Sequence, residues 1–163
     1  FEINELISSV VNSGKNFVVI LPNNDPGSEI ITKAYGNFKN NIKFKKFSSL
    51  RFNYFLTLLK NSEFIIGNSS SGITEAEIYG IPAINIGTRQ DNRSKNKNII
   101  HVKSEQTKIL SAIKKISGKK FKPLRGFGTG KSSSRFIKIL DDKKIWNFSV
   151  QKQFVEWPKQ YFI

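Results

Sequence analysis

The chain has 163 residues, of which 38% are hydrophobic and 24% charged, so it is long enough to bury a core and is typical of a globular domain. It contains no cysteine, which excludes disulfides and thiolate chemistry and fits a cytoplasmic enzyme. We find no membrane-length apolar run and no signal peptide, so no membrane partner is predicted. Methionine is absent even at position 1, and we expect further residues before Phe1.

The net charge of +15 makes a basic nucleic-acid-binding module one hypothesis. The lysines, however, are spread along the chain and often neighbour Asn, Ile or Phe. This distribution indicates a compositional bias more than a binding stripe, and no recognition motif accompanies it. Nucleic-acid binding is therefore kept only as the alternative from a different functional class.

Hydrophobic spacing predicts helices and strands that alternate at short intervals. The expected helices cover 2–12, 29–38, a segment ending at 61, 73–79, 106–116 and 132–140, and the expected strands cover 17–21, 42–47, 64–66, 83–86 and 99–102. Such alternation predicts an α/β fold, a Rossmann-like doubly wound parallel sheet. Ligands of such sheets bind beyond the carboxyl ends of the strands.

The loop Asn68–Gly72 is a candidate phosphate site between the strand at 64–66 and the helix that follows it. Free N–H groups in the first turn of a helix attract anions, and Ser69–Ser71 would add hydroxyl donors. Gly72 would let a ligand approach the backbone closely. A helix cap needs one such residue and this loop has four in a row, which places a phosphate ligand modestly ahead of a purely structural cap.

Three of the charged residues after this loop are considered for the site. Glu75 lies about one turn into the predicted helix, from where its side chain can reach the loop. Arg89 follows the next strand and should return to the same edge, because successive parallel strands end on one side. Arg93 lies four residues further along a polar run, where a solvated charge is the simpler interpretation.

The segments Asn68–Ile73 and Gly80–Gln90, together with Glu75 and Arg93, resemble the signature of UDP-N-acetylglucosamine 2-epimerases. The hydrolysing branch, which releases N-acetylmannosamine for sialic acid synthesis, is the more similar one. The turn at Pro22–Ser28 consists of ordinary turn residues, but it also resembles the Pro-Asn-x-Asp-x-Gly-Ser segment of that branch.

This resemblance implies the C-terminal half of a two-domain enzyme of the glycosyltransferase-B type. Residues 1–145 would form a Rossmann-like UDP-binding domain, and the aromatic segment 146–163 would pack back on the enzyme. The N-terminal domain expected before Phe1 would carry the catalytic acid and base, and the full-length protein would be a homo-oligomer. A related 2-epimerase of the bacillosamine type, or a glycosyltransferase, remains an alternative.

The resemblance also implies the residues that would contact UDP. Asn23 would contact the nucleotide, and Leu50 would lie against the uracil, although a hydrophobic staple beside a helix start is an equally good interpretation of Leu50. Glu75 would accept hydrogen bonds from the ribose. The remaining expected contacts are to the diphosphate: Ser69, Ser70, Gly72 and Arg89.

No cofactor and no metal is expected. The single histidine, His101, ends an apolar strand and is interpreted as structural.

Overall fold

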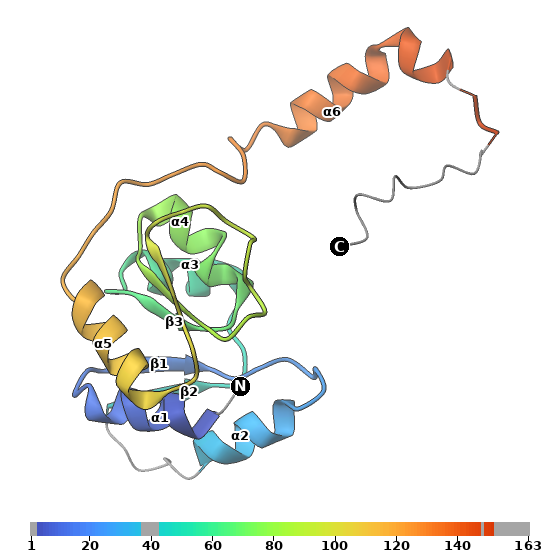
Figure 1. Cartoon of the computed structure of the whole chain (residues 1–163). Coiled ribbons are helices and arrows are strands. Elements are labelled where there is room, and N and C mark those ends of the chain that lie inside the picture. The colour runs from blue at the N-terminus through green and yellow to red at the C-terminus, as the bar shows by residue number, and fades with distance from the viewer. Residues whose placement is uncertain (1–2, 37–42, 148, 152–163) are drawn as a thin grey trace, which may run out of the picture. The chain divides into compact units, whose positions relative to one another are not determined.

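The computed structural model describes residues 3–36, 43–147 and 149–151 (Figure 1). The helices and strands of these residues are, in chain order, α1 Ile3–Asn12, β1 Phe17–Ile20, α2 Ser28–Gly36, β2 Phe44–Phe47, α3 Phe52–Lys60, β3 Ile65–Gly67, the 3₁₀ helix η1 Ser70–Gly72, α4 Glu75–Tyr79, β4 Ala83–Ile86, β5 Ile99–Val102, α5 Gln106–Ile116, α6 Ser132–Asp141 and the 3₁₀ helix η2 Lys143–Asn147. The expected alternation of helices and strands is therefore confirmed. None of the helices in this part of the chain has the length and apolar character needed to cross a bilayer.

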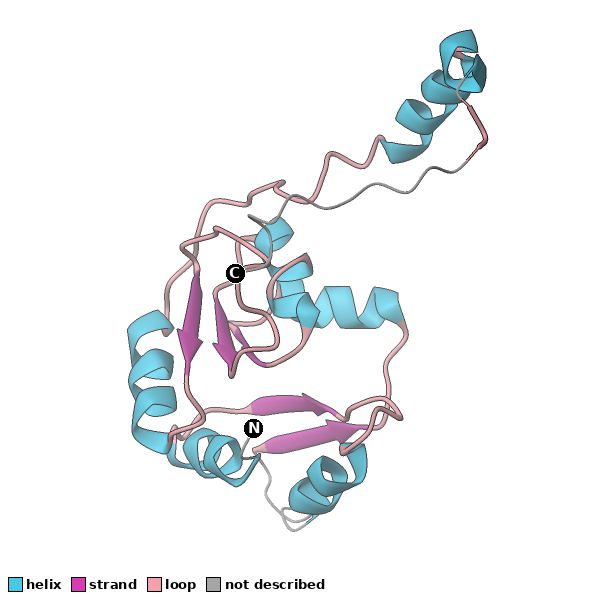
Figure 2. Ribbon diagram, turned by 45° about the vertical axis from the view of Figure 1, so that its right-hand side comes forward, coloured by secondary structure: helices cyan, strands magenta, loops and turns pink. Residues whose placement is uncertain are grey.

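All described strand pairs are parallel, but they form two sheets (Figure 2). β1 pairs with β2, where Phe17 lies opposite Phe44, and β4 lies between β3 and β5. The Rossmann-like α/β class is confirmed, whereas the single continuous sheet that we expected is divided between β1 and β3. At this division the two sheets meet through side chains, and the rings of Phe17 and Phe64 pack edge to face with centroids 6.0 Å apart.

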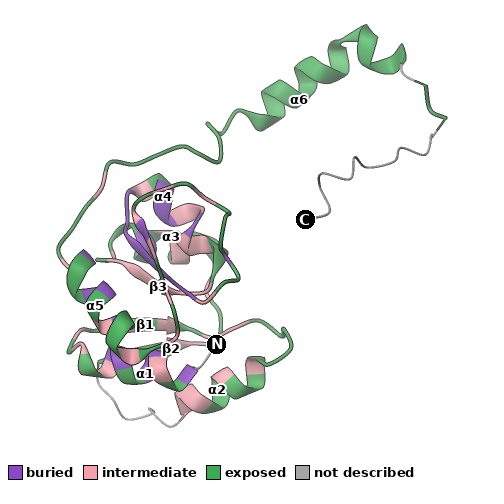
Figure 3. Ribbon diagram, viewed as in Figure 1, coloured by how far each residue is buried: buried purple, intermediate pink, exposed green. Residues whose placement is uncertain are grey.

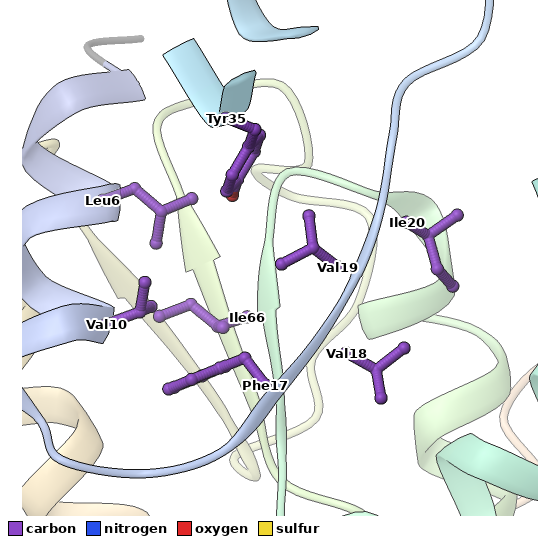
Figure 4. A pocket seen from close by; sticks show the side chains of 8 residues that line it. All are labelled: Leu6, Val10, Phe17, Val18, Val19, Ile20, Tyr35 and Ile66. Carbon is purple, nitrogen blue, oxygen red and sulfur yellow. The ribbon is translucent and has the colours of Figure 1, made fainter. Parts of the chain in front are cut away.

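A cavity of about 90 Å³ lies at the division between the two sheets (Figure 4). The residues that line it come from α1, all of β1, Tyr35 of α2 and Ile66 of β3. Burial in these surroundings raises the pKa of Tyr35 to about 12, because the phenolate loses its hydration.

Helices cover both faces of the β3–β5 sheet, as a doubly wound fold requires (Figure 3). β4 is buried along its whole length, and its side chains alternate between the two faces. Ile84 and Ile86 pack against α1 and α5, whose buried apolar residues recur at helical spacing. Ala83 packs against Ile73 and Ile99 in a separate cluster, and a third cluster joins α3 to α4.

The edge at which the strands begin is tied together by Glu63. Its carboxylate accepts hydrogen bonds from Lys15 Nζ at 2.7 and 2.9 Å and from the Gly118 N–H at 2.7 Å. The hydrogen bond from Lys15 is the main cause that lowers the pKa of Glu63. Segments before β1, before β3 and after α5 are thereby joined at the edge opposite the predicted ligand site.

The chain divides into two compact units, Phe1–Gly126 and Phe127–Ile163. The sequence placed the end of the UDP-binding domain at residue 145, and that boundary stays a prediction. In the second unit, α6 is followed by η2, and Trp146 Nε1 donates a hydrogen bond to the carbonyl of Leu140 at 2.8 Å. Most of the expected aromatic tail, residue 148 and residues 152–163, lies outside the described residues, so its packing stays a prediction.

Candidate functional site

Loops from three strands meet at the edge where those strands end. Arg89, after β4, lies 4.0 Å from the carboxylate of Asp25 in the loop after β1. Gln90 Nε2 donates to the carbonyl oxygen of Asn68, after β3, at 2.9 Å. The structure thus brings together the loops that carry Asn23, Ser69 and Arg89, which are far apart in the sequence.

The serine loop, residues 68–72, contains a tight 3₁₀ turn. Ser69 stands before η1, and its hydroxyl accepts the Ser71 N–H at 3.3 Å, while the N–H groups of residues 72–74 donate to the carbonyls of Ser69 and Ser70. Both Ser69 and Ser70 are exposed residues, so a ligand in solvent can reach this turn.

Helix α4 begins at Glu75 and has five residues, so the expected start at residue 73 was wrong. Serine side chains compete with the helical backbone for hydrogen bonds, which favours a tight turn over a regular first helical turn. Consequently few peptide dipoles are aligned behind the serine loop, and the helix end contributes less to anion binding than we expected.

Glu75 and Gly72 take different positions around this turn. Glu75 is half-buried as the first residue of α4, and its carboxylate accepts a short hydrogen bond from the hydroxyl of Thr74. Gly72 lies against the sheet, since a Cβ built there would be 3.6 Å from Ala83 and 3.7 Å from Ile65. These distances are ordinary packing contacts, and close approach of a ligand at Gly72 stays a prediction.

The two predicted contacts from the β1–β2 sheet lie at the same strand edge. Asn23 is exposed in the loop after β1, and Leu50 is half-buried between β2 and α3. The structure therefore places all seven predicted site residues beyond the carboxyl ends of strands, in loops, in η1 or at the start of α4. Their contacts with a nucleotide stay predictions.

Arg93 is exposed, as expected of a solvated charge, but it also makes a contact within its own loop. Its Nη1 donates to Gln90 Oε1 at 2.7 Å, and Gln90 is only 2% exposed. Sequence reasoning missed the role of Gln90, because a glutamine inside a polar run gives no sign of burial. The only local signal was its place between two arginines on a loop that follows a buried strand.

Glu77 was also missed. It lies in α4, is 5% exposed and accepts hydrogen bonds from the loop after β4 and from the Gly126 N–H. In the sequence it appears as one of two acidic residues in a short amphipathic helix, and the partners that bury it come from distant segments.

His101 lies beside this edge at the end of β5. Its Nδ1 is 3.2 Å from Asp91 Oδ1 and 3.1 Å from Asn85 Nδ2. Across the described residues, no three His, Asp or Glu side chains converge as a metal site would need.

A family model described as UDP-N-acetylglucosamine 2-epimerase matches residues 2–141. The chain belongs to the UDP-N-acetylglucosamine 2-epimerase family. A relative of that name from Neisseria meningitidis serogroup B is 43% identical over 148 residues, which are 88% of this chain and 39% of the relative. A Legionella pneumophila relative named UDP-N,N'-diacetylbacillosamine 2-epimerase (hydrolyzing) is 29% identical over 136 residues, or 83% of this chain and 36% of that protein.

Among solved structures, the Methanocaldococcus jannaschii UDP-GlcNAc 2-epimerase in complex with UDP-GlcNAc and UDP matches with a TM-score of 0.69 and 23% identity. The match covers 86% of this chain and 41% of that one, and it supports the Rossmann-like fold. This member of the epimerase family thus spans about two fifths of the length of the relatives it matches.

Proposed function

We propose that the chain is the UDP-binding half of a hydrolysing UDP-N-acetylglucosamine 2-epimerase, which converts its substrate into N-acetylmannosamine and UDP for sialic acid-type sugar synthesis. The observation that carries this proposal is the convergence of the serine loop and Arg89 at one strand edge, through the contacts of Asn68 with Gln90 and of Arg89 with Asp25. Membership of the epimerase family supports the nucleotide sugar as ligand.

In this proposal the chain holds the leaving group. The hydroxyls of Ser69 and Ser70 donate to the diphosphate, and Arg89 neutralises the negative charge that grows on it as UDP departs. Glu75 accepts hydrogen bonds from the ribose hydroxyls, while Asn23 and Leu50 contact the rest of the nucleotide. The arrangement has the geometry of ligand sites in open α/β sheets, where loops beyond the strand ends surround the ligand.

The proposed reaction has two steps. A base removes the proton from sugar C2 and the bond between C1 and the UDP oxygen breaks, which gives a glucal intermediate and UDP. Water then adds across the double bond, with hydroxyl at C1 and a proton at C2 on the opposite face. The acid and base of these steps are expected on an N-terminal domain of the same protein, and the complete enzyme is proposed to be a homo-oligomer.

A bacillosamine-type 2-epimerase is the second candidate, because the Legionella pneumophila relative bears that name. The two candidates differ in the sugar, not in the nucleotide. Release of N-acetylmannosamine from UDP-N-acetylglucosamine, compared with turnover of UDP-N,N'-diacetylbacillosamine by the complete enzyme, separates them.

Calorimetric titration of the 163-residue chain with UDP tests the proposed half-site directly. We expect UDP to bind and the chain alone to release no N-acetylmannosamine. Failure of UDP to bind would contradict the nucleotide site, and sugar release by the isolated chain would contradict the location of the acid and base.

A further inference from the structure

Glu77 is a buried carboxylate that the proposed UDP contacts do not use. Its Oε1 accepts the Gly126 N–H at 2.7 Å, and its Oε2 lies 3.2 Å from Asn96 Nδ2 and 3.5 Å from Ser94 Oγ. Three donors therefore converge on two oxygens, which is the pattern that an ionised carboxylate accepts. None of the three partners carries a formal charge.

The backbone of residues 124–126 packs closely against Glu77. A Cβ built on Gly126 would lie 2.5 Å from Glu77 Oε1, so any side chain at this position would displace the carboxylate. The Leu124 N–H also donates to the backbone carbonyl of Glu77 at 3.0 Å. Through these contacts α4 holds both the segment 124–126 and the loop that contains Ser94 and Asn96.

The loop held by Glu77 is the arginine loop, residues 87–98, which joins β4 to β5. Ser94 directly follows Arg93, whose guanidinium donates to Gln90 at 2.7 Å. Gln90 in turn donates to the carbonyl of Asn68, the residue before Ser69. The arginine loop is thus bound to Glu77 through Ser94 and Asn96, and to the serine loop through the bond from Gln90 to Asn68.

We propose that Glu77 is a positioning residue that fixes the arginine loop, and with it Arg89, in the geometry that binds the diphosphate. This role rests on the proposed UDP site. Burying a charge is costly unless it is well bonded, and a packed apolar residue would hold α4 against its neighbours at lower cost. An ionised carboxylate at this place is instead suited to holding polar loop atoms in one arrangement.

The Glu77→Gln variant removes this role with little change in shape. If the glutamine oxygen keeps the Gly126 N–H, its NH₂ group faces the Asn96 Nδ2 donor. Asn96 cannot turn its amide to accept, because its Oδ1 already accepts the Asn98 N–H at 2.9 Å. One donor is therefore left facing another, and the anchor of the arginine loop at Asn96 is lost.

The test compares UDP with uridine, which lacks the phosphates, in titrations of the 163-residue chain. For Glu77→Gln we expect the Kd of UDP to rise at least about tenfold and the Kd of uridine to change less than about twofold. Gly126→Ala displaces the carboxylate without changing any charge and should give the same selective loss. Glu105→Gln is the matched control, since Glu105 is exposed, makes no side-chain cap to α5 and carries the same charge.

The selective loss of UDP binding in both variants, with the control unchanged, would support the role of Glu77. Equal losses for UDP and uridine would overturn it, because they would indicate a general defect of the domain. Unchanged UDP affinity in either folded variant would also overturn it. In that case the proposed function would still hold, as long as the unaltered chain binds UDP. If the unaltered chain bound no UDP, the proposed function itself would fail and this role with it.

Discussion

Arg89 and Arg93 are four residues apart, yet we expect different results when each is replaced by alanine. Loss of Arg89 should mainly weaken UDP binding, and loss of Arg93 should mainly lower stability. The side chain of Arg89 is 65% exposed, and its ion pair with Asp25 is long, at 4.0 Å. An exposed pair of this kind contributes at most about 1 kcal/mol to stability. Arg89→Ala should therefore change the free energy of unfolding by under about 1 kcal/mol.

The same substitution should be costly for UDP. Losing a charge-assisted contact to phosphate costs about 1.5–3 kcal/mol, which raises the Kd by a factor of about 10 to 150. Because Arg89 is exposed and its partner Asp25 is also 64% exposed, the diphosphate can take the place of Asp25 at little cost.

Arg93→Ala should instead weaken the fold. It removes the donor to Gln90 Oε1, which lies on a residue that is only 2% exposed. Because Arg93 itself is exposed, water can partly replace that donor, so the loss should be about 1 kcal/mol, the lower end of the cost of an unsatisfied buried acceptor. Gln90 keeps its bond to the Asn68 carbonyl, so the serine loop stays attached and the loss in UDP affinity should be under about 1 kcal/mol.

Both quantities can be measured on the same samples, by calorimetry with UDP and by urea denaturation. Arg135→Ala, an exposed arginine of α6, controls for the loss of one positive charge and should change neither quantity measurably. Equal losses of affinity in the two variants, or a larger loss for Arg93→Ala, would refute the assignment of Arg89 to the diphosphate.

Three further predictions concern other parts of the chain. Glu75→Gln should weaken binding of UDP but not of its 2′,3′-dideoxyribose analogue, and an equal loss with both ligands would remove the ribose role. Because burial raises the pKa of Tyr35 to about 12, whereas an unfolded tyrosine ionises near 10, stability should fall between these pH values by about 1.4 kcal/mol per unit. Tyr35→Phe should lack this part of the fall in urea curves at pH 9 and 11, and an identical fall in both proteins would contradict it. Gly80→Ala should lower the free energy of unfolding by more than about 2 kcal/mol, since φ is 67° and the new Cβ would lie 2.1 Å from the Phe121 carbonyl oxygen. Gly118→Ala, at φ 74° with no atom near the new Cβ, should lower it by only about 1 kcal/mol through backbone strain, and thermal unfolding of both variants measures the difference.

The elements of the fold could be predicted because each is specified by local spacing. Helix α5 covers 106–116 as expected, since Ile109, Ile113 and Ile116 recur at helical spacing and all three are buried. Strand β4 likewise covers 83–86 as expected, because a short apolar run that directly follows a proline favours a buried strand over a helix. The start of α4 was placed too early, because hydroxyl side chains that compete with the backbone leave the hydrophobic pattern unchanged.

The place of the candidate site could be predicted for a topological reason. Parallel strands end on one side, so the loops with Asp25, Asn68 and Arg89 had to gather at one edge. The division of the sheet between β1 and β3 could not be predicted, because strand pairing depends on packing between distant segments. The same holds for the burial of Gln90 and Glu77, whose partners lie in other loops.

The short turn at the serine loop affects how nucleotide binding should depend on dissolved salt. The N–H groups of residues 72–74 already donate within the turn, and α4 behind it has only five residues. At the proposed site, attraction of a diphosphate would then depend mainly on the exposed Arg89 and on the +15 charge of the chain as a whole. Charges in contact with water are screened by dissolved ions over about 8 Å at physiological ionic strength. Nucleotide capture by this domain should accordingly be sensitive to salt, strongest in dilute buffer and weakened by competing anions.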